Sequence, residues 1–163
     1  MINGDRVRQA REISGLTQAD GSFFVSIEVG IKYRNGLRIR PKFTITQDLG
    51  SVEVLEAIKN YFDCGKVYTN PKKHSAEFVV ESIKDLKTTI IPHFLEYPLQ
   101  LDKQRAFSIL MNVVNILDTK AHYDKLVCAD MLNLIFSMNV SSNRSTELKN
   151  KYIDIPRLSR RSS

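Results

Sequence analysis

Residues 37–47 alternate strictly between apolar and polar side chains, which is the pattern of a β-strand with one buried face. The apolar positions are Leu37, Ile39, Pro41, Phe43 and Ile45, and the polar positions are Arg38, Arg40, Lys42, Thr44 and Thr46. Residues 22–30 are rich in β-formers, and Asn35-Gly36 is a strong signal for a hairpin turn between the two strands. Pro41 has no amide hydrogen, so it predicts a bulge or an unpaired position in the second strand.

A helical period follows the hairpin and is then followed by a second hairpin. Val52, Leu55, Ile58 and Phe62 recur at helical spacing after Ser51, which we expect to be the N-cap. Gly65 ends that helix, and strands are predicted over residues 66–70 and 75–81 around a turn at 71–74. The chain then favours three further helices. One starts at a capping box of Ser82 and Asp85 and is broken or kinked by Pro92, and the others span about 102–117 and 122–138.

The order helix-hairpin-helix-hairpin-helix reads as one unit duplicated within the chain. It predicts an α+β fold with the order α-β-β-α-β-β-α. The four-stranded antiparallel sheet would have helices on one face and an open polar face on the other. Residues 1–140 are interpreted as one domain. Residues 141–163 form a polar, basic tail, read as a disordered end with minor phosphate contact as the alternative.

Composition and charge narrow the class of protein. The 163 residues carry a formal net charge of +6, which suits a nucleic-acid partner without proving one. No apolar run approaches the ~20 residues that span a bilayer, so no membrane partner is expected. Cys64 and Cys128 are not spaced as a metal pair and are interpreted as reduced structural thiols, and the three histidines lie too far apart in the sequence to predict a zinc site.

The junction between the first helix and the first strand carries the candidate chemistry. Gly15 and Ala19 lie four residues apart on one helix face, and Ser14 extends this small-residue surface. Two such helices could pack with their backbones in near contact, which would bring two copies of Asp20 side by side. A carboxylate at a helix C-terminus is unfavourable by roughly 0.3–1 kcal/mol, and a divalent cation would reverse the sign of that effect.

Ile13–Gly21 resembles the signature of the LAGLIDADG homing endonucleases. Gly15, Leu16, Ala19, Asp20 and Gly21 match the nine-residue pattern, and Ile13 stands for its leading leucine. Ser14, Thr17 and Gln18 depart from it; Gln18 replaces the first acid, whereas the metal-binding acid of the family corresponds to Asp20. The α-β-β-α-β-β-α order extends the resemblance over roughly residues 7 to 117.

The resemblance implies a set of site residues. Asp20 and the Ala19 carbonyl would hold Mg²⁺, with Mn²⁺ or Ca²⁺ able to occupy the same site. Gln47 would position water, and Lys103, or else Arg105, would be the basic residue of the site. A single motif implies a homodimer on a pseudo-palindromic target, joined through Ser14, Gly15, Gln18 and Ala19.

The polar face of the predicted sheet is the candidate surface for double-stranded DNA, and the family resemblance implies that it is saddle-shaped. Arginine and lysine suit guanine edges and phosphates, amides and hydroxyls can read several bases, and glutamate can accept from cytosine. An ordinary solvated sheet face is the alternative. At ~3.3 Å per residue, residues 37–47 span roughly 35 Å, about ten base pairs. The candidate residues are Phe24, Ser26, Glu28, Lys32, Arg34, Arg38, Arg40, Lys42, Thr44, Thr46, Lys66, Tyr68, Asn70, Ser75 and Glu77.

Three functions fit these features. The first is a homodimeric, Mg²⁺-dependent, site-specific DNA endonuclease encoded within an intron, acting in an organelle (mitochondrion or chloroplast) or in a prokaryotic cytoplasm. The second is a maturase that binds intron RNA, which nothing in the sequence excludes. The third is a DNA-binding protein of this fold without catalysis, and retention of Asp20 and Gln47 argues against it.

Overall fold

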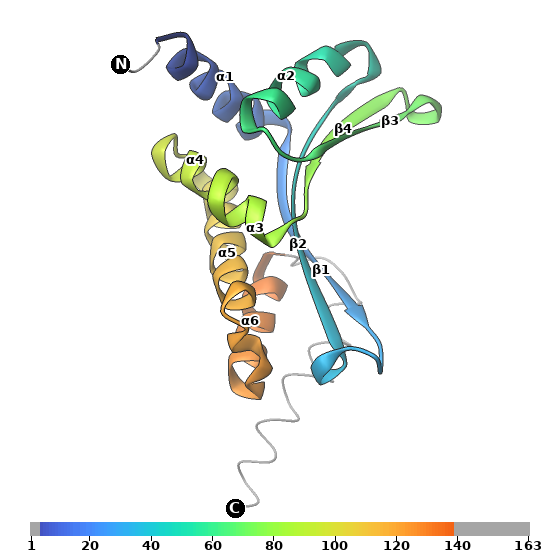
Figure 1. Cartoon of the computed structure of the whole chain (residues 1–163), viewed down its shortest axis with the longest axis vertical. Helices are drawn as coiled ribbons and strands as arrows, with labels where there is room; N and C mark the ends of the chain where they lie inside the picture. The colour runs from blue at the N-terminus through green and yellow to red at the C-terminus, as the bar shows by residue number, and fades with distance from the viewer. Residues whose placement is uncertain (1–3, 139–163) are drawn as a thin grey trace, which may run out of the picture.

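The computed structural model describes residues 4–138 (Figure 1). The polar tail expected over residues 141–163 therefore lies outside the described residues. A short π-helical turn over Leu86–Ile90 joins the helical turn Ile83–Asp85 to the helix Ile91–Glu96. The elements in chain order are α1 (Gly4–Asp20), β1 (Gly21–Val29), β2 (Leu37–Asp48), α2 (Val52–Phe62), β3 (Lys66–Asn70), β4 (Ser75–Val80), α3 (Ile83–Asp85), α4 (Ile91–Glu96), α5 (Leu101–Asp118) and α6 (Lys125–Met138).

The four strands form one antiparallel sheet in the order β1-β2-β4-β3. The two hairpins meet at β2 and β4, where Phe43 pairs with Val80 and Gln47 pairs with Ala76. The helices within residues 4–138 lie on one side of the curved sheet, and the opposite face is open (Figure 1). The predicted α+β fold with helices on one face is confirmed.

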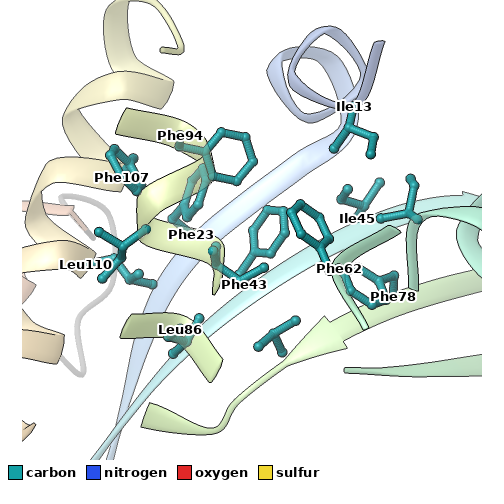
Figure 2. Close-up of a cluster of buried hydrophobic side chains, with 14 of the residues drawn as sticks. Ile13, Phe23, Phe43, Ile45, Phe62, Phe78, Leu86, Phe94, Phe107 and Leu110 are labelled. Carbon is teal, nitrogen blue, oxygen red and sulfur yellow. The ribbon is translucent and has the colours of Figure 1, made fainter. Parts of the chain in front are cut away.

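Aromatic side chains fill the core between the sheet and the helices (Figure 2). Phe23 and Phe43, which face each other across β1 and β2, stack with ring centroids 4.9 Å apart. Phe94 from α4 and Phe107 from α5 meet Phe23 edge-on. Fully burying one such side chain stabilises the fold by about 1.5–3 kcal/mol. The core therefore ties α4 and α5 to the centre of the sheet.

A second apolar cluster supports the far end of the long β1–β2 hairpin. Val25 and Leu37 from the hairpin pack in one buried group with Val113 from α5 and with Met131 and Ile135 from α6. The helices α5 and α6 thus hold the part of the hairpin that β4 does not reach. Among the described residues, no helix is long and apolar enough to cross a membrane.

Pro41 and Pro92 do not simply interrupt the strand and the helix in which they lie. Pro41 pairs with Val25 of β1 in an unbroken register, so the bulge that was one of the two predicted possibilities is absent. The pairing of β2 with β4 starts only at Phe43, which leaves Pro41 without a pairing partner on the β4 side. Pro92 lies at the start of α4, directly after the π-helical turn. Because proline cannot donate the usual helical hydrogen bond and crowds the preceding turn, the widened turn takes the place of a break.

The two predicted helix-capping serines behave differently. Ser82 accepts a hydrogen bond from the Asp85 amide, as the capping box predicts. Ser51 is the N-cap residue of α2, as predicted, but its side chain makes no capping hydrogen bond. The reason is local: residues 49–51 form a 3₁₀ turn, and Ser51 has φ −107° and ψ 18° instead of the extended conformation that a cap requires.

Candidate nuclease site

The junction of α1 and β1 is a sharp change of direction that only glycine allows. A Cβ on Gly21 would lie 2.5 Å from the Thr17 Cγ2 and 2.7 Å from the Thr17 carbonyl oxygen. Thr17 is itself buried, and its hydroxyl donates to the Ile13 carbonyl at 2.8 Å. The chain therefore enters the strand directly at the helix end, and Asp20, the last residue of α1, is left exposed there.

Gln47 lies directly beside Asp20. Gly21 pairs with Ile45 across β1 and β2, so the end of β2 runs past the end of α1. The Gln47 side-chain amide donates to Asp20 Oδ2 at 2.8 Å and to the Thr46 carbonyl at 2.9 Å. Two residues that are 27 positions apart in sequence thus form one polar pair at the surface.

Lys103 reaches the same corner from the first turn of α5. Its ammonium donates to the Gly21 carbonyl, one residue beyond Asp20. Arg105 lines a separate hollow of about 310 Å³, together with Asp102, Ala106 and the last turn of α6. The structure therefore brings Asp20, Gln47 and Lys103 together and leaves Arg105 apart from them.

One side of α1 is open and the other is bound within the chain. A Cβ on Gly15 would meet nothing within 4 Å, and Ala19 is exposed, so this strip of the helix is bare. Gln18 instead accepts from the Gln100 amide at 2.9 Å and donates to the Gln100 carbonyl at 3.4 Å. Ser14 is half-buried and donates to the Tyr97 carbonyl at 3.0 Å. Of the four predicted interface residues, Gly15 and Ala19 present the open strip.

A buried histidine supports the motif helix from behind. His93 of α4 is 7% exposed, with Nε2 3.2 Å from the Ser14 hydroxyl and Nδ1 3.4 Å from the Tyr61 hydroxyl. Because Ser14 donates to Tyr97, it accepts from Nε2–H, and Nδ1 accepts from Tyr61. Burial lowers the pKa of His93 to about 4, so the ring is neutral at pH 7.

The predicted DNA-contacting residues that belong to strands lie in cross-strand rows of the sheet, whereas Lys32 and Arg34 lie in the connection between β1 and β2. Ser26 lies opposite Arg40, Glu28 opposite Arg38, and Thr46, Glu77 and Tyr68 form one row across three strands. Thr44 is the exception and corrects the prediction. It lies between Ser22 and Val79 and is only 3% exposed. The alternation of side chains along the strand therefore predicted an accessibility to DNA that Thr44 does not have.

The tip of the β1–β2 hairpin is fastened to the helical side. The Arg34 guanidinium lies 4.1 Å from the centre of the Tyr123 ring, and Asn35 donates to the His122 carbonyl at 3.2 Å. Lys32 lies over the ring of Tyr33 at 5.1 Å. The cations at this tip therefore have defined positions before any ligand arrives.

An ion-pair network that the sequence did not reveal crosses the same face. Arg40 lies 2.8 Å from Glu28 and 3.5 Å from Glu81, and Lys42 lies 3.7 Å from Glu81. The hydrogen bond from Arg40 is the main cause of a lowered pKa for Glu28, and the same bond raises the pKa of Arg40. Glu81 follows β4 directly, and extending the alternation of Ser75 and Glu77 to residue 81 would have placed it on this face.

Comparison with known proteins identifies the family. Residues 13–114 match the sequence profile of the LAGLIDADG endonucleases, so the chain belongs to that family. It is 32% identical over 144 residues to the homing endonuclease I-ApeII of Aeropyrum pernix, covering 84% of both chains. It is 32% identical over 111 residues to a probable intron-encoded endonuclease of Neurospora crassa, covering 68% of this chain and 25% of that protein.

A solved structure with the same fold is the I-LtrWI LAGLIDADG homing endonuclease bound to target DNA. The TM-score is 0.76 at 28% identity, covering 79% of this chain and 43% of that one. The chain thus spans most of I-ApeII, but less than half of the DNA-bound relative and a quarter of the Neurospora crassa protein. The protein is a homing endonuclease of the LAGLIDADG family.

Proposed function

We propose that the protein acts as a homodimer that cuts both strands of a long, pseudo-palindromic DNA target in a Mg²⁺-dependent hydrolysis. The observation that carries the proposal is the hydrogen bond between Gln47 and Asp20 at the exposed end of α1. It joins a carboxylate to a water-positioning amide beside a bare helix strip, so two copies of the chain would meet where the chemistry takes place.

We infer the dimer from the small number of metal ligands that one chain supplies at the junction. Among residues 4–138, no group of three or more acidic, histidine or cysteine side chains is placed to hold a metal, and the carboxylate that lies beside Gln47 at the junction is that of Asp20. Gly15 and Ala19 leave room for a second helix to approach closely. A two-fold axis between two α1 helices would bring a second Asp20 to the same point. The partner copy would thereby complete the site.

The donor set suits a hard divalent cation. The Asp20 carboxylate has Oδ2 bonded to Gln47, and its Oδ1 accepts no hydrogen bond from any described residue. The Ala19 carbonyl, in the last turn of α1, adds a second oxygen donor at the negative end of the helix dipole. Oxygen ligands of this kind are those that Mg²⁺ prefers, and Mn²⁺ or Ca²⁺ would accept the same set.

The side chains around this position have distinct roles. When bound, Mg²⁺ lowers the pKa of water and stabilises charge on the phosphate and the leaving oxygen. Gln47 orients a water molecule through its amide but takes no proton, because an amide is not a base at neutral pH. Lys103 places a positive charge beside Gly21, where it stabilises the negative charge that develops at the phosphate.

The sheet face supplies recognition. Arg38, Arg40 and Lys42 from β2 would lie along one half-site, with Glu28 and Glu77 available to accept from cytosine. β2 is twelve residues long, which corresponds to roughly 40 Å, or about twelve base pairs of duplex. Two such faces related by the dimer axis would cover both halves of a pseudo-palindrome, in an organelle or a prokaryotic cytoplasm where an intron of this kind resides.

Incubating the protein with a randomised duplex library, in Mg²⁺ and separately in EDTA, tests this function. The expected result is enrichment of cut ends at one pseudo-palindromic sequence in Mg²⁺ and none in EDTA. Selective retention of structured intron RNA without cutting of any duplex would instead favour a maturase. Selection of a duplex that is bound but never cut in Mg²⁺ or Mn²⁺ would favour a DNA-binding protein without catalysis.

A further inference from the structure

The cations on the open face of the sheet are held by acids before DNA is present. Arg38, Arg40 and Lys42 share two carboxylates, Glu28 and Glu81, through four ion pairs between 2.8 and 3.9 Å. Each of the five side chains is between a quarter and just over half exposed. The network is therefore in reach of a ligand and has a net charge of only +1.

Arg40 occupies the centre of the network. One terminal nitrogen faces Glu28 at 2.8 Å and the other faces Glu81 at 3.5 Å, so its guanidinium is held from both ends. A guanidinium has five N–H donors, and these two contacts leave three of them free. Arg40 can therefore bond a base edge while both carboxylates keep their places.

Glu28 and Glu81 come from opposite edges of this part of the face. Glu28 is on β1 and is fixed by the Tyr33 hydroxyl at 3.0 Å, whereas Glu81 follows β4, at the position that would pair with Lys42 if the register continued. The two acids thus close the network on both sides of β2. An arrangement from three separate segments is less readily lost to side-chain motion than one isolated pair.

We propose that Glu81 is a specificity-determining residue, which with Glu28 positions Arg40 and Lys42 to read base edges and withholds these cations from the phosphates of other DNA. The proposal rests on the proposed DNA-binding function of this face. At the target, hydrogen bonds to bases add to the existing ion pairs. On other DNA, the cations reach phosphates only by leaving their carboxylates, and no base contact offsets that loss.

The proposal predicts that removing the Glu81 charge changes the affinity for target DNA and the affinity for non-target DNA in different ways. Removing the Glu81 charge frees Lys42 and one end of Arg40, so binding to a non-target duplex tightens by up to about fivefold, the equivalent of an exposed ion pair. Its dependence on salt steepens by about 0.9 in slope for each added phosphate contact. Binding to the target stays unchanged or weakens, because Arg40 is less well positioned. The ratio of target to non-target affinity falls.

The test compares Glu81→Gln with Glu56→Gln in the whole 163-residue chain. Glu56 is exposed on α2, on the helical side of the sheet (Figure 1), and carries the same charge, but it makes no ion pair with any described residue. Dissociation constants for the selected target and a scrambled duplex are measured in EDTA across a salt series. Glu81→Gln should tighten scrambled-duplex binding and steepen its salt slope, while Glu56→Gln should leave that slope as it is in the wild type.

Equal changes in scrambled-duplex affinity and salt slope for the two variants would overturn the proposal, since the net charge of the protein would then explain them. An unchanged affinity ratio in Glu81→Gln would overturn it as well. Both results leave the proposed function intact provided that wild type prefers its target. A wild-type protein with no preference among duplexes would contradict the proposed function, and with it this inference.

Discussion

The Gln47 side-chain amide lies 2.8 Å from the Asp20 carboxylate, although the two residues come from different elements. Asp20 ends α1 and Gln47 is the penultimate residue of β2, so the pairing of β1 with β2 sets their separation. A shift of the strand register by one residue would move Gln47 to the other face of the sheet. The geometry of the candidate site therefore depends on the hairpin as much as on the motif helix.

Gly15→Leu should separate the dimer while leaving the fold of each chain intact. A Cβ at this position meets nothing within 4 Å in the chain itself, so the added side chain clashes only with a second helix. Overpacking of this kind reduces the free energy of association by about 1–3 kcal/mol per site. Because the two-fold axis places the substitution in both chains, the cost to the dimer is doubled. Sedimentation should show a monomer with wild-type circular dichroism, and the control Asn112→Leu, on an exposed position of α5, should remain a dimer. A wild-type protein that is monomeric at micromolar concentration would refute the dimer.

Gly21→Ala should destabilise the chain itself, in contrast to Gly15→Leu. Its Cβ would lie 2.7 Å from the Thr17 carbonyl oxygen and 2.9 Å from the Thr17 Cα, so the backbone must shift. We expect a loss of about 1–3 kcal/mol in the free energy of unfolding, measured by denaturant titration. Adding Thr17→Ser removes the methyl group 2.5 Å away and should restore only part of the stability. Wild-type stability in Gly21→Ala would show that the junction is looser than the structure indicates.

His93 should make stability depend on pH. Burial lowers its pKa from the ordinary 6.5 to about 4, so between these values the unfolded chain binds a proton that the folded chain does not. The contribution of neutral His93 to the free energy of unfolding is therefore complete above pH 6.5. It is lost as the pH falls from 6.5 toward 4, and it does not change further below pH 4. The total loss in the free energy of unfolding from this group is on the order of 3 kcal/mol. Denaturant titrations at several pH values should show a shallower pH dependence for His93→Gln than for wild type. Parallel curves for the two proteins would rule out a titrating role for His93.

Lys103 and Arg105 can be separated by their effect on cleavage. Lys103 bonds the Gly21 carbonyl beside Asp20, while Arg105 lines a different hollow. Lys103→Met should slow single-turnover cleavage by about 10²-fold, the usual effect of removing one group that stabilises developing charge. Arg105→Met, which removes the same charge from the same helix, should cut at nearly the wild-type rate. The reverse order of effects would assign the basic role to Arg105.

Periodicity predicted most of the secondary structure because the buried faces are regular. The alternation from Leu37 to Ile45 gives β2 and its face, and the helical spacing of Leu55, Ile58 and Phe62 gives α2. The order of strands in the sheet could not be read from these patterns, since pairing of β2 with β4 depends on contacts between distant segments. Ser51 takes the N-cap position but makes no capping hydrogen bond because it belongs to a 3₁₀ turn, which depends on the local backbone more than on residue type.

The candidate site was predictable in parts. Asp20 and Gln47 followed from the resemblance, and the register of β1 with β2 brings them together. The burial of Thr44 was not predictable, because strand parity gives the face of a side chain and not what covers it. The bond between His93 and Ser14 joins residues 79 positions apart, and no local pattern signals it.

Asp20→Asn provides the most direct test of the central claim, that Asp20 holds the metal for cleavage. The change keeps the shape of the side chain and removes its charge, and it also relieves repulsion between the two facing carboxylates of a dimer. One selected target is used for a gel-shift titration in EDTA and a cleavage time course in Mg²⁺, with Asp130→Asn on the exposed side of α6 as the control for net charge. We expect Asp20→Asn to abolish cleavage while binding in EDTA is unchanged or tighter, and Asp130→Asn to cut like wild type. Cleavage by Asp20→Asn at the wild-type rate would contradict the account and leave Asp20 as an ordinary residue at a helix end.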